Sequence, residues 1–198
     1  AGPGYSSFGG TGSNASKLMA GWVPGNAPAF FPLGMGIKLE KGDSLIMQIH
    51  YPAGSDGEQD QTEVRLKFSD PEDFREVLID PVLNHYQLNE GQLFIPANTE
   101  RSFTQNAKLD AHYSLLSVLP HMHLLGKSIR VNATGPNDTI NVIDIPQWDF
   151  HWQSTYIFPK LLKVPTGYSL NVKASYDNTD SNPENPNDPP LDVHLGEE

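Results

Sequence analysis

The feature of this sequence that most constrains its fold is a series of short runs in which apolar and polar residues alternate. Residues 45–51, LIMQIHY, and residues 63–68, EVRLKF, place every second side chain on the same face of an extended chain. Similar runs recur at residues 93–95, 111–119, 123–132, 139–145, 152–158 and 168–176. A period of two residues is typical of β-strands that bury one face.

Turn-forming residues separate these runs. The chain holds 17 Gly and 17 Pro in 198 residues, a larger share than the roughly 12% of average proteins. We expect a turn at residues 41–43, and the polar segments 1–16, 53–61 and 177–190 read as a lead-in, a linker and a surface loop. Only residues 71–77 suggest a helical turn. The sequence therefore predicts an all-β protein, a mostly antiparallel β-sandwich of jelly-roll type.

The net charge of -11 argues against anionic partners. Binding to nucleic acid phosphates needs many basic side chains, and this chain has 13 Lys and Arg against 24 Asp and Glu. Its apolar stretches are short and broken by Pro and Gly, far below the roughly 20 residues that a membrane span requires. We therefore expect no nucleic acid partner and no membrane span. The absence of Cys fits oxidising and reducing compartments alike.

The sharpest local feature is His121-Met122-His123. In a strand, the two histidines lie on one face with their Cα atoms about 6.5 Å apart, so both imidazoles can bind one metal ion. Neutral imidazole suits Cu, Zn, Fe and Ni, so the spacing does not name the metal. The alternative is a pair of surface or hydrogen-bonded histidines. By spacing alone, the remaining histidines read as structural; they are His50, His85, His112, His151 and His194.

Other chemistries find little support in the sequence. There is no Cys nucleophile and no G-x-S-x-G turn, and neither the P-loop nor the dinucleotide-binding glycine pattern is present. A pair of carboxylates assembled in space stays open. The aromatic residues Trp148, Phe150, Trp152 and Tyr156 predict an aromatic core with one exposed face rather than a ligand box.

Four segments, taken together, resemble the copper type II, ascorbate-dependent monooxygenase family. They are GWVPG at 21–25, PLGMGIKLEKGDSLIMQIHYP at 32–52, LPHMHLLGKSIRV at 119–131, and WDFHWQSTYIF at 148–158 with the Asn- and Pro-rich segment that follows. The most specific part is Q-I-H-Y followed about seventy residues later by H-M-H-L-L-G. Peptidylglycine alpha-hydroxylating monooxygenase and dopamine beta-monooxygenase are familiar members, and the Asn- and Pro-rich segment is closer to bacterial relatives.

The resemblance implies two jelly-roll domains, each with one copper ion. One copper, held by three His, passes electrons, and the other, held by an H-x-H pair and a Met, hydroxylates a substrate C–H bond with dioxygen while ascorbate supplies electrons. By position, His121 and His123 resemble the ligands of the hydroxylating copper. His50 resembles the third His of the electron-transfer copper. The resemblance implies no catalytic residue beyond these metal ligands.

Two departures from the family pattern bear on this assignment. No His precedes His50, and the segment with the Met ligand does not appear before residue 198; Met19, Met35, Met47 and Met122 do not match its position. The resemblance therefore implies a piece of a longer polypeptide. Residues 1–58 would be the C-terminal part of the first domain with a flexible lead-in, and residues 59–198 most of the second, ending before its Met ligand.

Three functions follow as hypotheses. The first is a periplasmic or extracellular copper monooxygenase that hydroxylates a small organic substrate with dioxygen and an ascorbate-like reductant, poorly active as this chain alone. The second is a non-catalytic copper-binding or interaction module of a larger assembly, favoured by the missing ligands. The third, a metal-free carbohydrate- or protein-binding sandwich, leaves the His motifs unexplained.

Overall fold

The computed structural model describes residues 4–6, 11–13, 16–23, 25–51, 54–69, 74–82 and 86–196. The chain divides into two compact units, Ala1–Asp80 and Pro81–Glu198. Residues 59–80 belong to the N-terminal unit.

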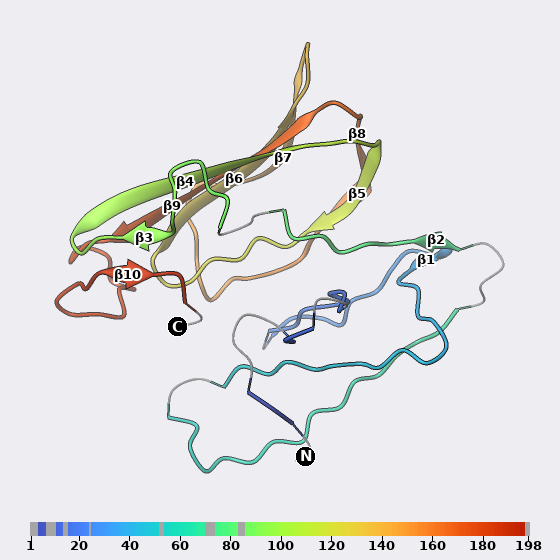
Figure 1. Cartoon of the computed structure of the whole chain (residues 1–198), viewed down its shortest axis with the longest axis horizontal. Helices are drawn as coiled ribbons and strands as arrows, with labels where there is room; N and C mark the ends of the chain where they lie inside the picture. Colours follow the sequence, from blue (N-terminus) through green and yellow to red (C-terminus); the bar gives the residue numbers. More distant parts are fainter. Residues whose placement is uncertain are drawn as a thin grey trace. The chain divides into compact units, whose positions relative to one another are not determined.

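A four-stranded antiparallel sheet forms the centre of the C-terminal unit (Figure 1). Its strands lie in the order β4 (Thr99–Lys108), β9 (Ser169–Asn178), β6 (Gly126–Thr134) and β7 (Thr139–Ile145). The sequence of β9 explains its position, because Leu170, Val172 and Ala174 are buried while polar residues occupy the positions between them. Because the alternation is strict, one side of the strand packs on the core and the opposite side is exposed to water.

A second, two-stranded sheet packs on the first. It pairs β5 (Tyr113–Val118) with β8 (Tyr156–Val164) in antiparallel fashion. Val164 of β8 lies in one hydrophobic cluster with Ala133, Val142 and Leu170 of the larger sheet, and Leu115 of β5 packs against this cluster. The C-terminal unit thus has two antiparallel layers, and the described part of the chain is all-β with no helix, which confirms the predicted fold class at this level.

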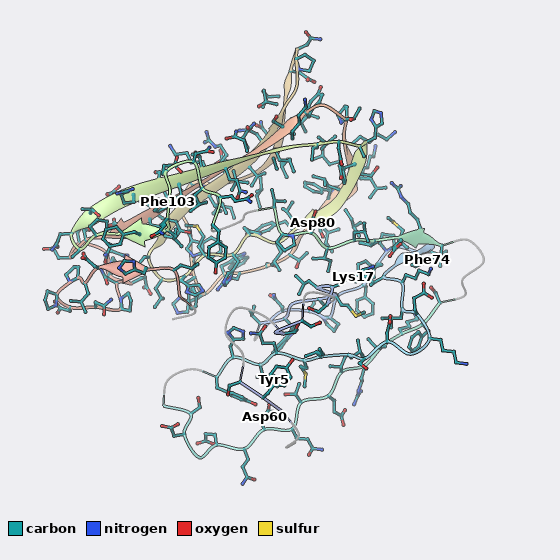
Figure 2. The ribbon with its side chains drawn as sticks, in the orientation of Figure 1. Tyr5, Lys17, Asp60, Phe74, Asp80 and Phe103 are labelled. Carbon is teal, nitrogen blue, oxygen red and sulfur yellow. The ribbon has the colours of Figure 1, made fainter. Side chains whose placement is uncertain are left out.

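A third strand pair closes one end of this unit. The strands β3 (Phe94–Ile95) and β10 (Val193–His194) pair antiparallel. Phe103 of β4, labelled in Figure 2, is 1% exposed and clusters with Leu88, Ile95 and Leu125. The Tyr176 ring meets the Phe103 ring edge-on, with 5.9 Å between centroids. Such aromatic pairs stabilise a core beyond the area they bury.

The N-terminal unit contains little regular structure in its described part. Its strands are β1 (Met35–Gly36) and β2 (Arg75–Glu76), which pair in parallel. The predicted turn at residues 41–43 is confirmed, because Gly42 has a φ of 99° and the Asp43 carboxylate accepts the Glu40 N–H at 2.8 Å. Residues 74–77 include β2, so the helical turn predicted there is wrong for these residues; residues 71–73 lie outside the described residues.

The strands predicted at residues 45–51 and 63–68 are wrong. Neither segment forms a strand, and both alternating sets of side chains are exposed; Leu45 is 52% and Ile46 50% exposed. An alternating pattern produces a strand only where a neighbouring strand pairs with its backbone and a core covers one face. Among the described residues of this unit, only the short β1–β2 pair supplies strand pairing.

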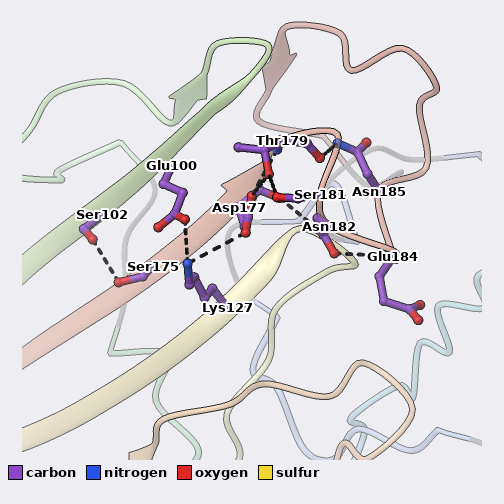
Figure 3. Close-up of polar contacts among 10 residues, drawn as sticks. All are labelled: Glu100, Ser102, Lys127, Ser175, Asp177, Thr179, Ser181, Asn182, Glu184 and Asn185. Atoms are coloured by element: carbon purple, nitrogen blue, oxygen red, sulfur yellow. Dashed lines mark hydrogen bonds and ion pairs between the residues drawn. The ribbon is translucent and has the colours of Figure 1, made fainter.

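From residue 179 onward, the Asn- and Pro-rich segment 177–190 forms no helix or strand, as predicted for a loop. Its first two residues belong to β9, and the next residues are joined by short hydrogen bonds to Asp177 (Figure 3): Thr179 donates to the Asp177 carboxylate at 2.6 Å, and Asn182 Nδ2 donates to the Asp177 carbonyl at 2.8 Å. Small polar side chains that bond the nearby backbone stabilise such turns.

Asn178 joins this segment to the core. Its side chain is fully buried, and Nδ2 donates to the carbonyls of Ile95, Pro96 and Leu191 at 3.2, 3.1 and 2.8 Å. Its Oδ1 accepts from Asn185 Nδ2 at 3.0 Å. One buried amide thus bonds three carbonyl groups from two places in the chain, residues 95–96 and residue 191, as buried polar groups require.

We expect Asn178→Ala to lower the free energy of unfolding by about 3 kcal/mol, because it leaves buried carbonyls without a donor. Urea denaturation followed by Trp fluorescence measures this change. Asn141→Ala, on the exposed side of β7, is the matched control and should change stability by less than about 0.5 kcal/mol. Equal stabilities of the two variants would contradict the role given to Asn178.

Candidate functional site

His121 and His123 lie close together in the loop between β5 and β6. Their ring centroids are 5.1 Å apart, with the ring planes at 78°. The sequence predicted a strand from residue 123, but β6 begins at Gly126, so that prediction is wrong at its start. The alternation persists in the loop: Met122 is 3% exposed, while His121 is exposed and His123 half-buried. The two imidazoles therefore converge as the H-x-H spacing suggested.

Packing of Met122 holds this loop on the sheet. Met122 clusters with Ile129 and Ala174, and Trp148 packs against the same cluster. The Trp148 Nε1 atom is buried and has no hydrogen-bond partner among the residues the structure describes. The indole ring is therefore positioned by apolar contacts, while the Trp148 backbone N–H donates to the Lys127 carbonyl at 2.9 Å.

Gly126 closes the loop with a tight turn. Its N–H donates to the His123 carbonyl at 2.8 Å. A Cβ at this position would lie 2.7 Å from Trp148 Cδ1 and 2.9 Å from both the His123 carbonyl oxygen and Met122 Cβ. Only glycine allows this close approach of the turn to the indole ring.

Gln153 determines which nitrogen of His121 carries the proton. Gln153 Nε2 donates to the Phe150 carbonyl at 2.9 Å, so the oxygen of this amide faces His121, at 2.6 Å from Nδ1. An amide oxygen only accepts hydrogen bonds, so His121 Nδ1 carries the hydrogen. In the neutral imidazole, Nε2 then has the lone pair that binds a metal ion, the arrangement that most metal-bound histidines share.

Charged groups fix the start of β6, next to the loop. Lys127 Nζ lies 2.6 Å from Glu100 and 3.7 Å from Asp177, as Figure 3 shows. The hydrogen bond with Glu100, aided by the charge of that carboxylate, raises the pKa of the Lys127 ammonium. Burial raises the pKa of Tyr176, which packs against the Met122 cluster. These contacts tie β6 to both β4 and β9.

The other histidines occupy separate surroundings. His50 is exposed, lies outside any strand and belongs to the N-terminal unit, so it is described only within that unit. His112 Nδ1 accepts the Thr166 N–H at 3.4 Å, and His194 stacks on Phe94 with 4.7 Å between centroids. His151 Nδ1 is 3.5 Å from the Asp149 carboxylate. His85 lies outside the described residues.

Sequence reasoning found the histidine pair but missed Gln153. This residue is 32 positions from His121, and no spacing rule connects the two. Within the described ranges, no group of three or more His, Asp or Glu side chains is arranged to hold a metal ion, and no helix is long and apolar enough to cross a membrane.

Comparisons of the chain with family models, with curated proteins and with solved structures find no match.

Replacing Gly126 should disturb the loop. We expect Gly126→Ala to lower the free energy of unfolding by about 1–3 kcal/mol, because the added methyl group must displace the indole ring or the His123 carbonyl. Thermal or urea denaturation measures the loss. Gly4→Ala is the matched control, since a Cβ there meets nothing within 4 Å. A Gly126→Ala protein as stable as this control would refute the tight packing.

If His121 is a metal ligand, as the H-x-H spacing predicts, removing the acceptor on Gln153 should weaken metal binding. We then expect Gln153→Leu to lower copper affinity about 10- to 100-fold, the usual effect of losing a partner of a ligating histidine. Gln153→Glu keeps an acceptor and should retain affinity. Competition titration with a copper chelator measures both variants. Unchanged affinity in Gln153→Leu would show that the amide does not orient a metal ligand.

Proposed function

We propose that this chain is part of a copper-dependent monooxygenase in which His121 and His123 bind a copper ion. The observation that carries the proposal is the convergence of two imidazoles, 5.1 Å between centroids, with the His121 tautomer set by Gln153. The resemblance of Q-I-H-Y and H-M-H-L-L-G to the copper type II family adds support from the sequence.

The residues present fit copper by the chemistry of their donors. Imidazole nitrogens suit Cu, Zn, Fe and Ni, whereas Mg, Ca and Mn prefer oxygen ligands. Met122 faces the core and is not available as the soft third ligand that the family resemblance implies. The described residues hold no group of three His, Asp or Glu side chains at the pair, so the proposal takes a thioether or a solvent molecule as the third ligand.

Bound copper would supply the redox chemistry that activates dioxygen. In the overall reaction, one oxygen atom enters a substrate C–H bond to give an alcohol, and the other leaves as water. The two electrons and two protons come from a reductant such as ascorbate, which becomes dehydroascorbate. The protein's part is to orient the imidazoles: the Gln153 amide oxygen keeps a proton on His121 Nδ1, and Met122 anchors the loop between the two histidines.

The strand pairing supports a jelly roll as the finer description of the fold. The pair β4–β9 lies in one sheet and β5–β8 in the other, so an outer pair of strands encloses an inner pair along the sequence. A long antiparallel hairpin that rolls up into two sheets produces this nested pairing.

The proposal also includes the second copper ion that the family resemblance implies, with His50 as one of its ligands. It places the protein in the periplasm or outside the cell.

A second candidate is a non-catalytic copper-binding module. The observation in its favour is that the described residues supply a pair of histidines and no third His, Asp or Glu near them. The two candidates share the first step, copper binding, and differ in whether bound copper consumes dioxygen.

We expect the purified chain, loaded with copper and desalted, to retain about one copper ion that depends on the histidine pair. Elemental analysis and the electron paramagnetic resonance spectrum of the Cu(II) form measure retention and nitrogen ligation. His121→Ala and His123→Ala should each abolish retention. His112→Ala is the matched control, because His112 contacts the Thr166 backbone instead, and it should retain copper.

Oxygen uptake then separates the two candidates. Ascorbate-dependent oxygen consumption that disappears in His121→Ala favours the monooxygenase, even at the low rate expected of this chain alone. Copper retention with oxygen uptake no higher than that of His121→Ala favours the binding module. A further decrease in His50→Ala would support the second copper site. Equal copper content in the wild type and in the His121→Ala/His123→Ala variant would refute both candidates.

A further inference from the structure

A small cavity of about 120 Å³ opens between the end of β7 and the start of β8. Its lining residues are Ile145, Gln147, Trp148, Asp149, Trp152 and Tyr156. The sequence predicted an aromatic core with one exposed face for this segment; Trp148 is half-buried against the core, and Trp152 is 70% and Tyr156 38% exposed. Three aromatic side chains therefore line one cavity, and two of them are accessible from solvent.

The charge of the cavity favours a cation. Among its lining residues, Asp149 carries the charge, and the chain as a whole has a net charge of -11. The Asp149 side chain is 63% exposed; its Oδ1 accepts the His151 N–H at 2.8 Å and lies 3.5 Å from His151 Nδ1, which restrains the carboxylate beside the cavity that it lines. A positive ligand is attracted both by this carboxylate and by the negative faces of aromatic rings.

The size of the cavity restricts the ligand further. Pockets for drug-sized molecules measure roughly 300–1,000 Å³, whereas a cavity of about 150 Å³ accepts a molecule the size of benzene. The space here therefore suits one compact group. Aromatic walls with a carboxylate are the surroundings that quaternary ammonium groups prefer.

We propose that this cavity binds the quaternary ammonium group of a small organic cation. Trp148, Trp152 and Tyr156 supply the aromatic faces and Asp149 the opposite charge. The site goes beyond the proposed function, since no metal ion takes part in it. It lies on the same segment as the histidine contact, because Trp148 packs on the Met122 cluster and Gln153 follows Trp152 directly.

Isothermal titration with choline as the probe tests the proposal on the full chain. We expect millimolar affinity, and 3,3-dimethylbutan-1-ol, the neutral analogue of the same shape, should bind at least about tenfold more weakly. Asp149→Asn and Trp152→Leu should each weaken choline binding by at least about tenfold. Thermal denaturation of each variant confirms that it folds.

The chain offers matched controls for both substitutions. Asp144→Asn changes a carboxylate that pairs with Arg130 at 2.7 Å, and Trp22→Leu changes a Trp that is 65% exposed in the N-terminal unit; neither should alter choline binding. The His121→Ala/His123→Ala variant should bind choline normally, so a failure of copper binding and a failure of this site are distinguishable.

Three results would overturn the proposal. The first is equal affinity for choline and its neutral analogue, and the second is choline binding that survives Asp149→Asn. The third is no heat of binding with choline while methyl glucoside binds, which would identify a sugar-stacking site instead.

Discussion

The C-terminal unit depends on the pairing of β9 on both of its edges. A strand in the middle of a sheet must satisfy all its backbone groups through its neighbours, and β9 does so with β4 on one side and β6 on the other. Its inward side chains form parts of the core, with Leu170 at one end and Ala174 nearer the other. The strand ends at Asn178, whose buried amide fastens the following loop.

The candidate metal ligands follow from that core. Met122 packs on Ala174 of β9, and a residue that points inward in an extended loop turns its two neighbours outward. His121 and His123 therefore lie together because of one buried side chain between them. The segment between β7 and β8 contributes to both candidate sites. Gln153 orients His121, and Trp148 packs on Met122 and lines the cavity proposed to bind a cation.

Prediction from the sequence succeeded where burial and pattern agree. The run at 139–145 coincides with β7, and the run at 168–176 falls within one to two residues of β9. In the N-terminal unit, residues 45–51 have an equally good pattern but are exposed on both faces. A period-two pattern states which side chains share a face. It does not supply the neighbouring strand or the core that stabilises the strand.

The sequence by itself determined the all-β class, the turn at Gly42 and the histidines that alternate around Met122, because these are local properties of composition and spacing. Tertiary structure alone decided the partner of His121, the glycine that Trp148 requires at position 126, and the burial of Asn178. Each of these joins residues far apart in the chain, at distances set by how the two sheets pack. No local pattern encodes such distances, since they depend on the whole core around them.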